Sequence, residues 1–335
     1  MKLLAAAALL AALVPAAPFG QSAPSASTAP SASTGPSARP GHGGRGDDCA
    51  RPPAAAGARH RTDGHPRDSM DLSPAEAAAV EARLNRILDG LGKGGHGPGK
   101  GRHGASESAS LRRAAQISIP VYFHVIHAGA KGNVSSAMIQ RQLSTLNTSY
   151  GGGNGGANAR VSFTLKAVSR TDNAAWFGDP ERYEGTYKPK LHKGDKSSLN
   201  LYSTYIGGDL LGWSTFPWKY KSEPQMDGVT IHYASMAGGS IENFNKGFSA
   251  THEVGHWLGL YHTFQDGCSG EGDRVTDTPA ERDPTNGCPS SKDTCPTPGE
   301  DPVHNYMDYG YDTCMTSFTP GQGTRIHNVW TAYRA

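Results

Sequence analysis

The stretch from His252 to His262, HEVGHWLGLYH, limits what this chain can be more than any other part of it. Residues four apart lie about 40° apart around an α-helix, so His252 and His256 point the same way and can bind one metal ion. On a continuous helix His262 would lie about 120° from that face, so the helix must end before it. Gly259 can end the helix, because glycine adopts positive φ at little cost. The chain can then turn back and bring His262 to the metal as a third ligand.

The ligand set and the neighbouring glutamate predict a catalytic zinc site. Three neutral imidazoles leave the fourth position of Zn²⁺ open to water, as in catalytic rather than structural zinc sites. Zinc lowers the pKa of that water toward about 7 and polarises a substrate carbonyl. Glu253 follows the first ligand, and its carboxylate can take the proton of the water and pass it to a leaving amine. We therefore expect a zinc endopeptidase with Glu253 as general base.

A rival class of zinc enzymes shares the HExxH pattern and takes its third ligand from a later glutamate. Glu271 lies at a suitable distance downstream, but it stands in GCSGEGDR, a glycine-rich stretch without helical periodicity. His262, which follows Gly259, is therefore the preferred third ligand.

The first 20 residues, MKLLAAAALLAALVPAAPFG, have the features of a signal peptide. Lys2 supplies a positive start, Leu3–Val14 is apolar but too short to span a bilayer, and Ala16 and Ala17 suit signal peptidase. No later segment is apolar for about 18 residues, so we expect no membrane anchor. We predict a secreted, extracellular protein, and the five cysteines fit that prediction. The net charge of +2 argues against a nucleic-acid partner.

Residues 21–114 have the composition of a prosegment. Stretches rich in small residues and proline or glycine, which are typical of flexible linkers, lie at 21–41 and 92–110. One helix is expected between them, at 73–91, with an apolar stripe formed by Val80, Leu84, Ile87, Leu88 and Leu91. That stripe must be buried on another part of the protein, and the downstream domain is the expected partner.

Residues 115–335 have the pattern of one folded catalytic domain that contains both strands and helices. Strands are expected at 117–128, 161–170, 199–208 and 227–236, and helices at 134–150, at the start of 249–262 and at 319–333. Capping boxes mark two helix starts, with Ser73 and Glu76 at the first and Thr319 and Gln322 at the second. Residues 263–318 are rich in Gly, Pro, Asp and Cys and show little periodicity, so we expect irregular structure there.

Together with the zinc motif, several blocks resemble the pappalysin family of metzincin metalloproteases. The blocks are LGWSTFPW (211–218), DGVTIHY (227–233), GDRVTDTP (272–279), NYMDY (305–309) and FTPGQGTRI (318–326). The resemblance covers about 115–335 and implies an α+β, metzincin-like catalytic domain of α/β type. Its mixed, twisted sheet and active-site helix would lie above an irregular lower subdomain tied by disulfides.

The resemblance also implies roles for two residues of NYMDY. Met307 would form an apolar floor beneath the zinc, although any core methionine packs in a similar way. Tyr309 would place its hydroxyl near the metal and stabilise the oxyanion of the tetrahedral intermediate.

Four of the five cysteines lie close together in the chain and allow three pairings, among which the sequence alone does not choose. The resemblance implies Cys268–Cys295 and Cys288–Cys314. Zinc binding by these cysteines is the alternative, but they contain no C-x-x-C pair, and export favours oxidation.

Two further metal sites are predicted. Relatives bind calcium near the loop after the zinc helix, and Asp273 and Asp277 are the oxygen donors we expect here, unless they form only a solvated acidic turn. Cys49, in GRGDDCARP, could occupy the open position on the zinc as a thiolate and keep a zymogen latent until the prosegment is cut. Otherwise Cys49 is unpaired or forms a dimer. Arg112 and Arg113 are the expected activation sites.

The sequence thus predicts a secreted, zinc-dependent endopeptidase made as a latent zymogen. Its partners would be protein or peptide substrates and its own prosegment as inhibitor. A non-catalytic binding protein on the same fold and a zinc hydrolase of non-peptide amides are the alternatives. The sequence does not predict cleavage specificity.

Overall fold

The computed structural model describes residues 56–60, 72–93 and 104–335. Backbone contacts divide the chain into Met1–Ala50 and Arg51–Ala335, and every described residue belongs to the second unit. The predicted signal peptide, the linker at 21–41 and Cys49 lie outside the described residues. In the described part of the chain, no helix has both the length and the apolar character that a bilayer crossing requires.

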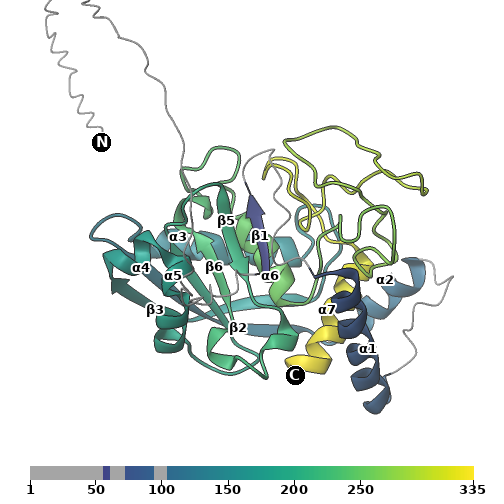
Figure 1. Cartoon of the computed structure of the whole chain (residues 1–335), viewed down its shortest axis with the longest axis horizontal. Coiled ribbons are helices and arrows are strands. Elements are labelled where there is room, and N and C mark those ends of the chain that lie inside the picture. The colour runs from purple at the N-terminus through teal and green to yellow at the C-terminus, as the bar shows by residue number, and fades with distance from the viewer. Residues whose placement is uncertain (1–55, 61–71, 94–103) are drawn as a thin grey trace, which may run out of the picture. The chain divides into compact units, whose positions relative to one another are not determined.

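A six-stranded mixed sheet forms the centre of the domain, in the order β1-β5-β6-β4-β2-β3 (Figure 1). Strands β2, β3, β4 and β6 are parallel, whereas β5 runs antiparallel to both of its neighbours, β6 and β1. All of β4 is buried, as expected for a parallel strand that is covered on both faces. The strands are β1 (Ala56–His60), β2 (Ile117–His127), β3 (Val161–Asp172), β4 (Leu199–Thr204), β5 (Leu210–Ser214) and β6 (Val229–His232).

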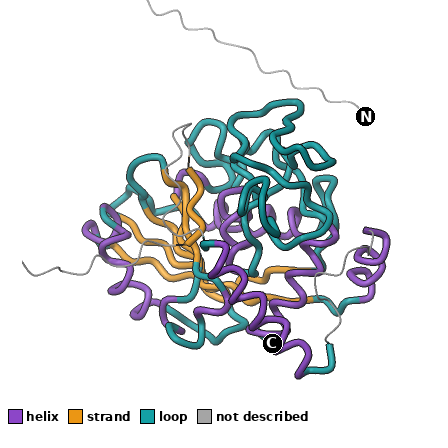
Figure 2. The backbone as a smooth tube through the Cα atoms, turned by 45° about the vertical axis from the view of Figure 1, so that its right-hand side comes forward, coloured by secondary structure: helices purple, strands orange, loops and turns teal. Residues whose placement is uncertain are grey.

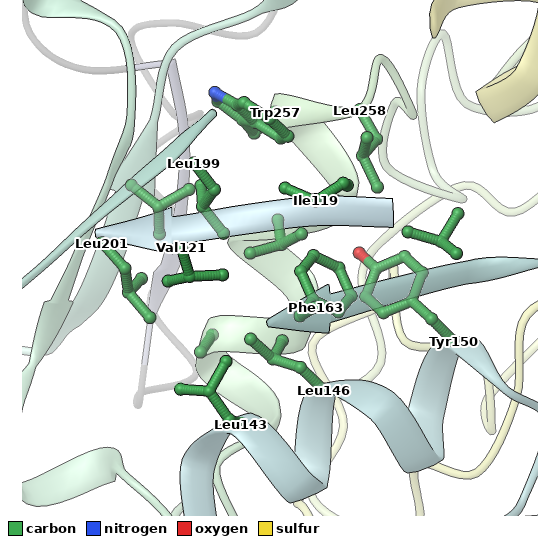
Figure 3. Close-up of a cluster of buried hydrophobic side chains, with 14 of the residues drawn as sticks. Ile119, Val121, Leu143, Leu146, Tyr150, Phe163, Leu199, Leu201, Trp257 and Leu258 are labelled. Atoms are coloured by element: carbon green, nitrogen blue, oxygen red, sulfur yellow. The ribbon is translucent and has the colours of Figure 1, made fainter. Parts of the chain in front are cut away.

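Helices cover the two faces of the sheet. Successive side chains of a strand point to opposite faces, and accordingly Leu201 of β4 packs into the main core while Tyr202 packs into a second, aromatic cluster. The main core contains apolar residues of α3 and α6 (Figure 3). The second cluster contains those of α4 and α5. The helices are α1 (Pro74–Gly90), α2 (Gly104–Arg113), α3 (Ser136–Tyr150), α4 (Ala174–Gly178), α5 (Pro180–Leu191), α6 (Phe248–Trp257) and α7 (Pro320–Tyr333).

Both predicted capping boxes are present. Ser73 and Glu76 exchange hydrogen bonds at the start of α1, and Thr319 and Gln322 do so at the start of α7. The predicted apolar stripe of α1 is buried only in part on the downstream domain. Leu84 and Leu88 pack against α7, whereas Leu91, at the end of the helix, is 54% exposed.

The structure differs from the sequence-based prediction in several places. The strand expected at 199–208 ends at Thr204, and β5 was not among the expected strands. Helix α2 lies partly within the predicted linker at 92–110, and β1 lies in the same predicted prosegment, which was expected to hold one helix. Helices α4 and α5 were not predicted, because their segments are polar and Pro189 lies inside α5. The strand expected at 227–236 shortens to β6 and continues as a 3-10 turn.

Residues 263–318, all of which the structure describes, form no helix or strand apart from one isolated bridge between Asn305 and Ser317. These loops gather on one side of the domain (Figure 2). Disulfides Cys268–Cys295 and Cys288–Cys314 cross-link them, in the pairing that the resemblance implied. The predicted fold class, with a mixed sheet and a disulfide-tied irregular part, is therefore confirmed.

Candidate metal centre and active site

Helix α6 carries the first two histidines of the motif and is buried along its whole length. His252 and His256 lie one turn apart, and their Nε2 atoms are 3.1 Å from each other. The helix ends as the glycine predicts. Gly259 has a φ of +94°, and the amide of Leu260 donates to the carbonyl of Gly255, as in a Schellman motif.

The turn after Gly259 brings His262 to the other two histidines. Its Nε2 lies 3.1 Å from Nε2 of His256. Gly259 is also needed for space, because a Cβ there would lie 2.6 Å from a methyl group of Val329 on α7. A larger residue would therefore both strain the backbone and push the third histidine away from the first two.

Two of the imidazoles are oriented by backbone carbonyls. Nδ1 of His252 donates to the carbonyl of Tyr306 at 2.7 Å, and Nδ1 of His256 donates to that of Leu260 at 2.8 Å. A carbonyl only accepts, so Nδ1 carries the proton and the Nε2 lone pair faces the cluster. Nitrogen ligands about 2.0–2.1 Å from a tetrahedral zinc ion lie about 3.3 Å apart, close to the spacing found here. The three histidines therefore fit a zinc ion, and they are the metal-binding group found among the described residues.

Glu253 lies between the histidine cluster and the antiparallel strand β5. Its side chain is fully buried. A Cβ built on Gly212 of β5 would lie 2.9 Å from Cγ of Glu253, so only glycine leaves room for this carboxylate beside the strand. Gly212 was quoted only as part of the block LGWSTFPW, and no role was predicted for it.

Met307 and Tyr309 both lie next to the three histidines. The side chain of Asn305 accepts a hydrogen bond from the amide of Met307 at 2.9 Å and closes a tight turn. The fully buried Met307 packs its sulfur against Gly255, between the first two histidines. The hydroxyl of Tyr309 lies 3.2 Å from Nε2 of His262. This hydroxyl can therefore reach a substrate group beside the metal position.

A buried polar network supports the segments on both sides of the site. Thr263, the residue after the third histidine, donates to Glu281 at 2.7 Å, and Lys292 donates to the same carboxylate at 2.8 Å. Asp308 accepts from the amides of Thr285 and Tyr309 at 2.8 and 2.7 Å. Burial, together with the charge of Asp308, raises the pKa of Glu281 to about 8. Glu281 thus ties side chains of this region together, whereas Asp308 holds backbone amides in place.

The two predicted calcium ligands already have partners within the protein. Asp273 is buried and accepts from the hydroxyl of Thr278 and the amide of Val275, and burial raises its pKa to about 7. Asp277 accepts from the hydroxyl of Thr319 at 2.6 Å and the amide of Gly321 at 2.8 Å. Its carboxylate therefore caps the N-terminus of α7, a role the sequence analysis missed. Calcium binding by this pair stays a prediction.

A family model described as pregnancy-associated plasma protein-A, the pappalysin peptidase family, matches residues 208–331. An extracellular metalloprotease of Neurospora crassa is 47% identical over 228 residues, which are 66% of this chain and 77% of that protein. One from Podospora anserina is 46% identical over 228 residues, 66% of this chain and 76% of that protein. This chain belongs to the pappalysin family of metalloproteases.

Two solved structures are similar to this pappalysin. Mature mirolysin of Tannerella forsythia, in complex with a cleaved peptide, is 32% identical, with a TM-score of 0.57, over 64% of this chain and 91% of that chain. A promirolysin variant from the same organism is 29% identical, with a TM-score of 0.62, over 78% of this chain and 90% of that chain. This pappalysin is accordingly a metalloendopeptidase with the mirolysin fold.

Proposed function

We propose that this pappalysin is a secreted zinc endopeptidase in which His252, His256 and His262 hold Zn²⁺ and Glu253 is the general base. The observation that carries the proposal is the convergence of three Nε2 atoms, 3.1 Å apart in two pairs, beside a fully buried glutamate. Relatives named extracellular metalloproteases support both the chemistry and the location.

Each residue of the site has a separate task in this proposal. Zinc, when bound, would acidify the attacking water and polarise the scissile carbonyl. Glu253 would take a proton from that water and return it to the leaving amine, and its burial beside β5 fixes the position of the carboxylate. The hydroxyl of Tyr309 donates a hydrogen bond to the carbonyl oxygen as that oxygen gains charge.

Strand β5 would align the substrate. An extended peptide can pair with the free side of an antiparallel strand through backbone hydrogen bonds. In this chain β1 pairs with β5 there, with Ala56 opposite Ser214, Arg59 opposite Gly212 and His60 opposite Leu210. Gly212 is the residue that contacts Glu253. A segment of the prosegment thus lies where a substrate would lie, which supports the proposal that the chain is made latent, with Cys49 as a further zinc ligand in the latent form.

Replacing Tyr309 by phenylalanine is expected to lower kcat by about 100-fold and to change KM much less, because the hydroxyl acts on charge that develops in the transition state. Initial rates on a peptide substrate would separate the two constants. A raised KM with an unchanged kcat would assign Tyr309 to substrate binding instead.

Metal removal tests the proposed function. Purified chain, with the wild-type sequence or with Cys49→Ser, is incubated with casein and with small amides, before and after treatment with a chelator. We expect casein cleavage that the chelator abolishes and zinc restores, with higher initial activity in Cys49→Ser. Cleavage that persists without metal would refute the zinc mechanism, and activity on amides alone would replace a peptidase with an amidase. Adding back calcium tests Asp273 and Asp277 through recovery of thermal stability rather than activity.

A further inference from the structure

We infer that helix α1 is a permanent part of the catalytic domain, in which Glu81 positions the turn that carries the third metal ligand. The inference rests on the proposed metal site, but it concerns a segment that the sequence analysis placed in the removable prosegment. Two contacts of α1 support the inference. One is a polar contact that reaches the turn from Gly259 to His262, called the ligand turn below, and the other is an apolar contact that binds the helix to the domain.

The polar contact is a two-point ion pair between α1 and α7. Glu81 accepts from the guanidinium of Arg325 at 2.6 and 3.1 Å, one bond to each carboxylate oxygen. The Arg325 side chain is 6% exposed and that of Glu81 is 19% exposed. Burial raises the pKa of Glu81, but the guanidinium outweighs it and leaves the pKa below the ordinary value. Among the described residues, Glu81 is the carboxylate that forms an ion pair with Arg325.

Arg325 and Tyr261 carry this contact to the ligand turn. Nε of Arg325 donates to the carbonyl of Gly259 at 2.8 Å, and its guanidinium lies 4.5 Å from the centre of the Tyr261 ring. The hydroxyl of Tyr261 donates to Glu81 at 3.2 Å. Gly259 and Tyr261 bracket the turn that ends at His262, so one carboxylate of α1 fixes both sides of it.

The apolar contact of α1 packs against residues next to the same turn. Leu84 and Leu88 pack against Val329, and Val329 is the residue that closes on Gly259. Nearer its start, Ala77 packs against Phe216 and Tyr261. Figure 1 shows α1 lying alongside α7.

Removal of α1 would expose this apolar surface and leave the buried guanidinium of Arg325 without its carboxylate. An uncompensated buried charge is strongly destabilising. A cut after Arg112 or Arg113, the expected activation sites, would therefore leave α1 bound without a covalent link, and a second cut between β1 and α1 would be needed to free β5 for substrate. Glu81 is a positioning residue because it acts on His262 through Arg325 and Tyr261 and does not touch the metal position.

The first test compares Glu81→Gln with Asp89→Asn in the full chain. Asp89 is an exposed residue of the same helix, so the control removes the same charge without the contact. We expect Glu81→Gln to weaken zinc affinity by about tenfold, since partners that orient ligands typically contribute that much. We also expect faster hydrogen exchange at residues 259–263. Equal zinc affinity and equal exchange in the two variants, measured well below the unfolding temperature, would overturn the positioning role.

The second test places one specific protease site between residues 61 and 71 and another between residues 94 and 103 of the full chain and cuts both, so that β1 and α1 lie on separate fragments. We expect the fragment with α1 to co-elute with the remainder in native size-exclusion chromatography and to separate only in denaturant. Separation in native buffer, with zinc affinity unchanged, would overturn the inference. Co-elution can be read even if the chain cleaves no casein, so failure of the proposed function and failure of this inference are distinguishable.

Discussion

Glu253→Ala is expected to lower kcat by about 10³- to 10⁴-fold while the protein keeps its zinc. A positioned general base contributes about 10²- to 10⁴-fold, and Glu253 is the carboxylate beside the histidine cluster that contacts β5. The orientation of His252 and His256 does not depend on Glu253, because backbone carbonyls hold both imidazoles. Metal content by elemental analysis and kcat on a peptide substrate are the two measurements.

The matched control is Glu271→Ala. Glu271 is exposed and lies in the loop after the site, and it was the rival third ligand. We expect this variant to retain both zinc and activity. If Glu271→Ala loses zinc, the ligand set proposed here is wrong. If Glu253→Ala keeps wild-type turnover, the base must be sought elsewhere.

Arg334→Ala is expected to lower the free energy of unfolding by about 3–5 kcal/mol, the usual cost of removing one partner of a buried ion pair. Arg334 and Asp227 are both buried, and the guanidinium donates to both carboxylate oxygens at 3.0 and 3.1 Å. It also lies 3.6 Å from the centre of the Trp257 ring, at the end of α6. For a domain of this size the change corresponds to a fall in Tm of about 10 °C, which calorimetry of the metal-loaded protein would detect.

Two further variants show whether the loss comes from the unpaired charge. Combining Asp227→Asn with Arg334→Met removes both charges, so we expect the double variant to be more stable than the sum of its single changes. Arg182→Ala, at an exposed arginine of α5, should change Tm little. An Arg334→Ala variant as stable as Arg182→Ala would show that the pair contributes nothing to the folded state.

The catalytic core of the site could be predicted from the sequence because its rules are local. The spacing of His252, His256 and His262, the glycine between them and the adjacent glutamate lie within one helix and one turn. Local hydrogen bonds likewise made the capping boxes of α1 and α7 predictable. The disulfides needed the family resemblance, because spacing alone allows three pairings.

Other parts of the site depend on contacts between residues far apart in the chain. Asp277 caps the N-terminus of α7, a contact that no local pattern predicts, while its role as a calcium ligand stays a prediction. Gly212 lies in the block LGWSTFPW, but that block does not show its role, which comes from the approach of Glu253 across the space between β5 and α6. Strand β1 is too short to be recognised by periodicity and exists through its pairing with β5.

By itself, then, the sequence determined the helix that bears the proposed metal ligands and the proposed general base, and the capping boxes that begin α1 and α7. Only the tertiary structure decided that α1 packs against α7 and that Arg325 and Arg334 are buried in specific ion pairs. The physical reason is range. Helix periodicity and capping act over a few residues, whereas burial of a charge depends on which distant carboxylate, Glu81 or Asp227, the folded chain brings to it.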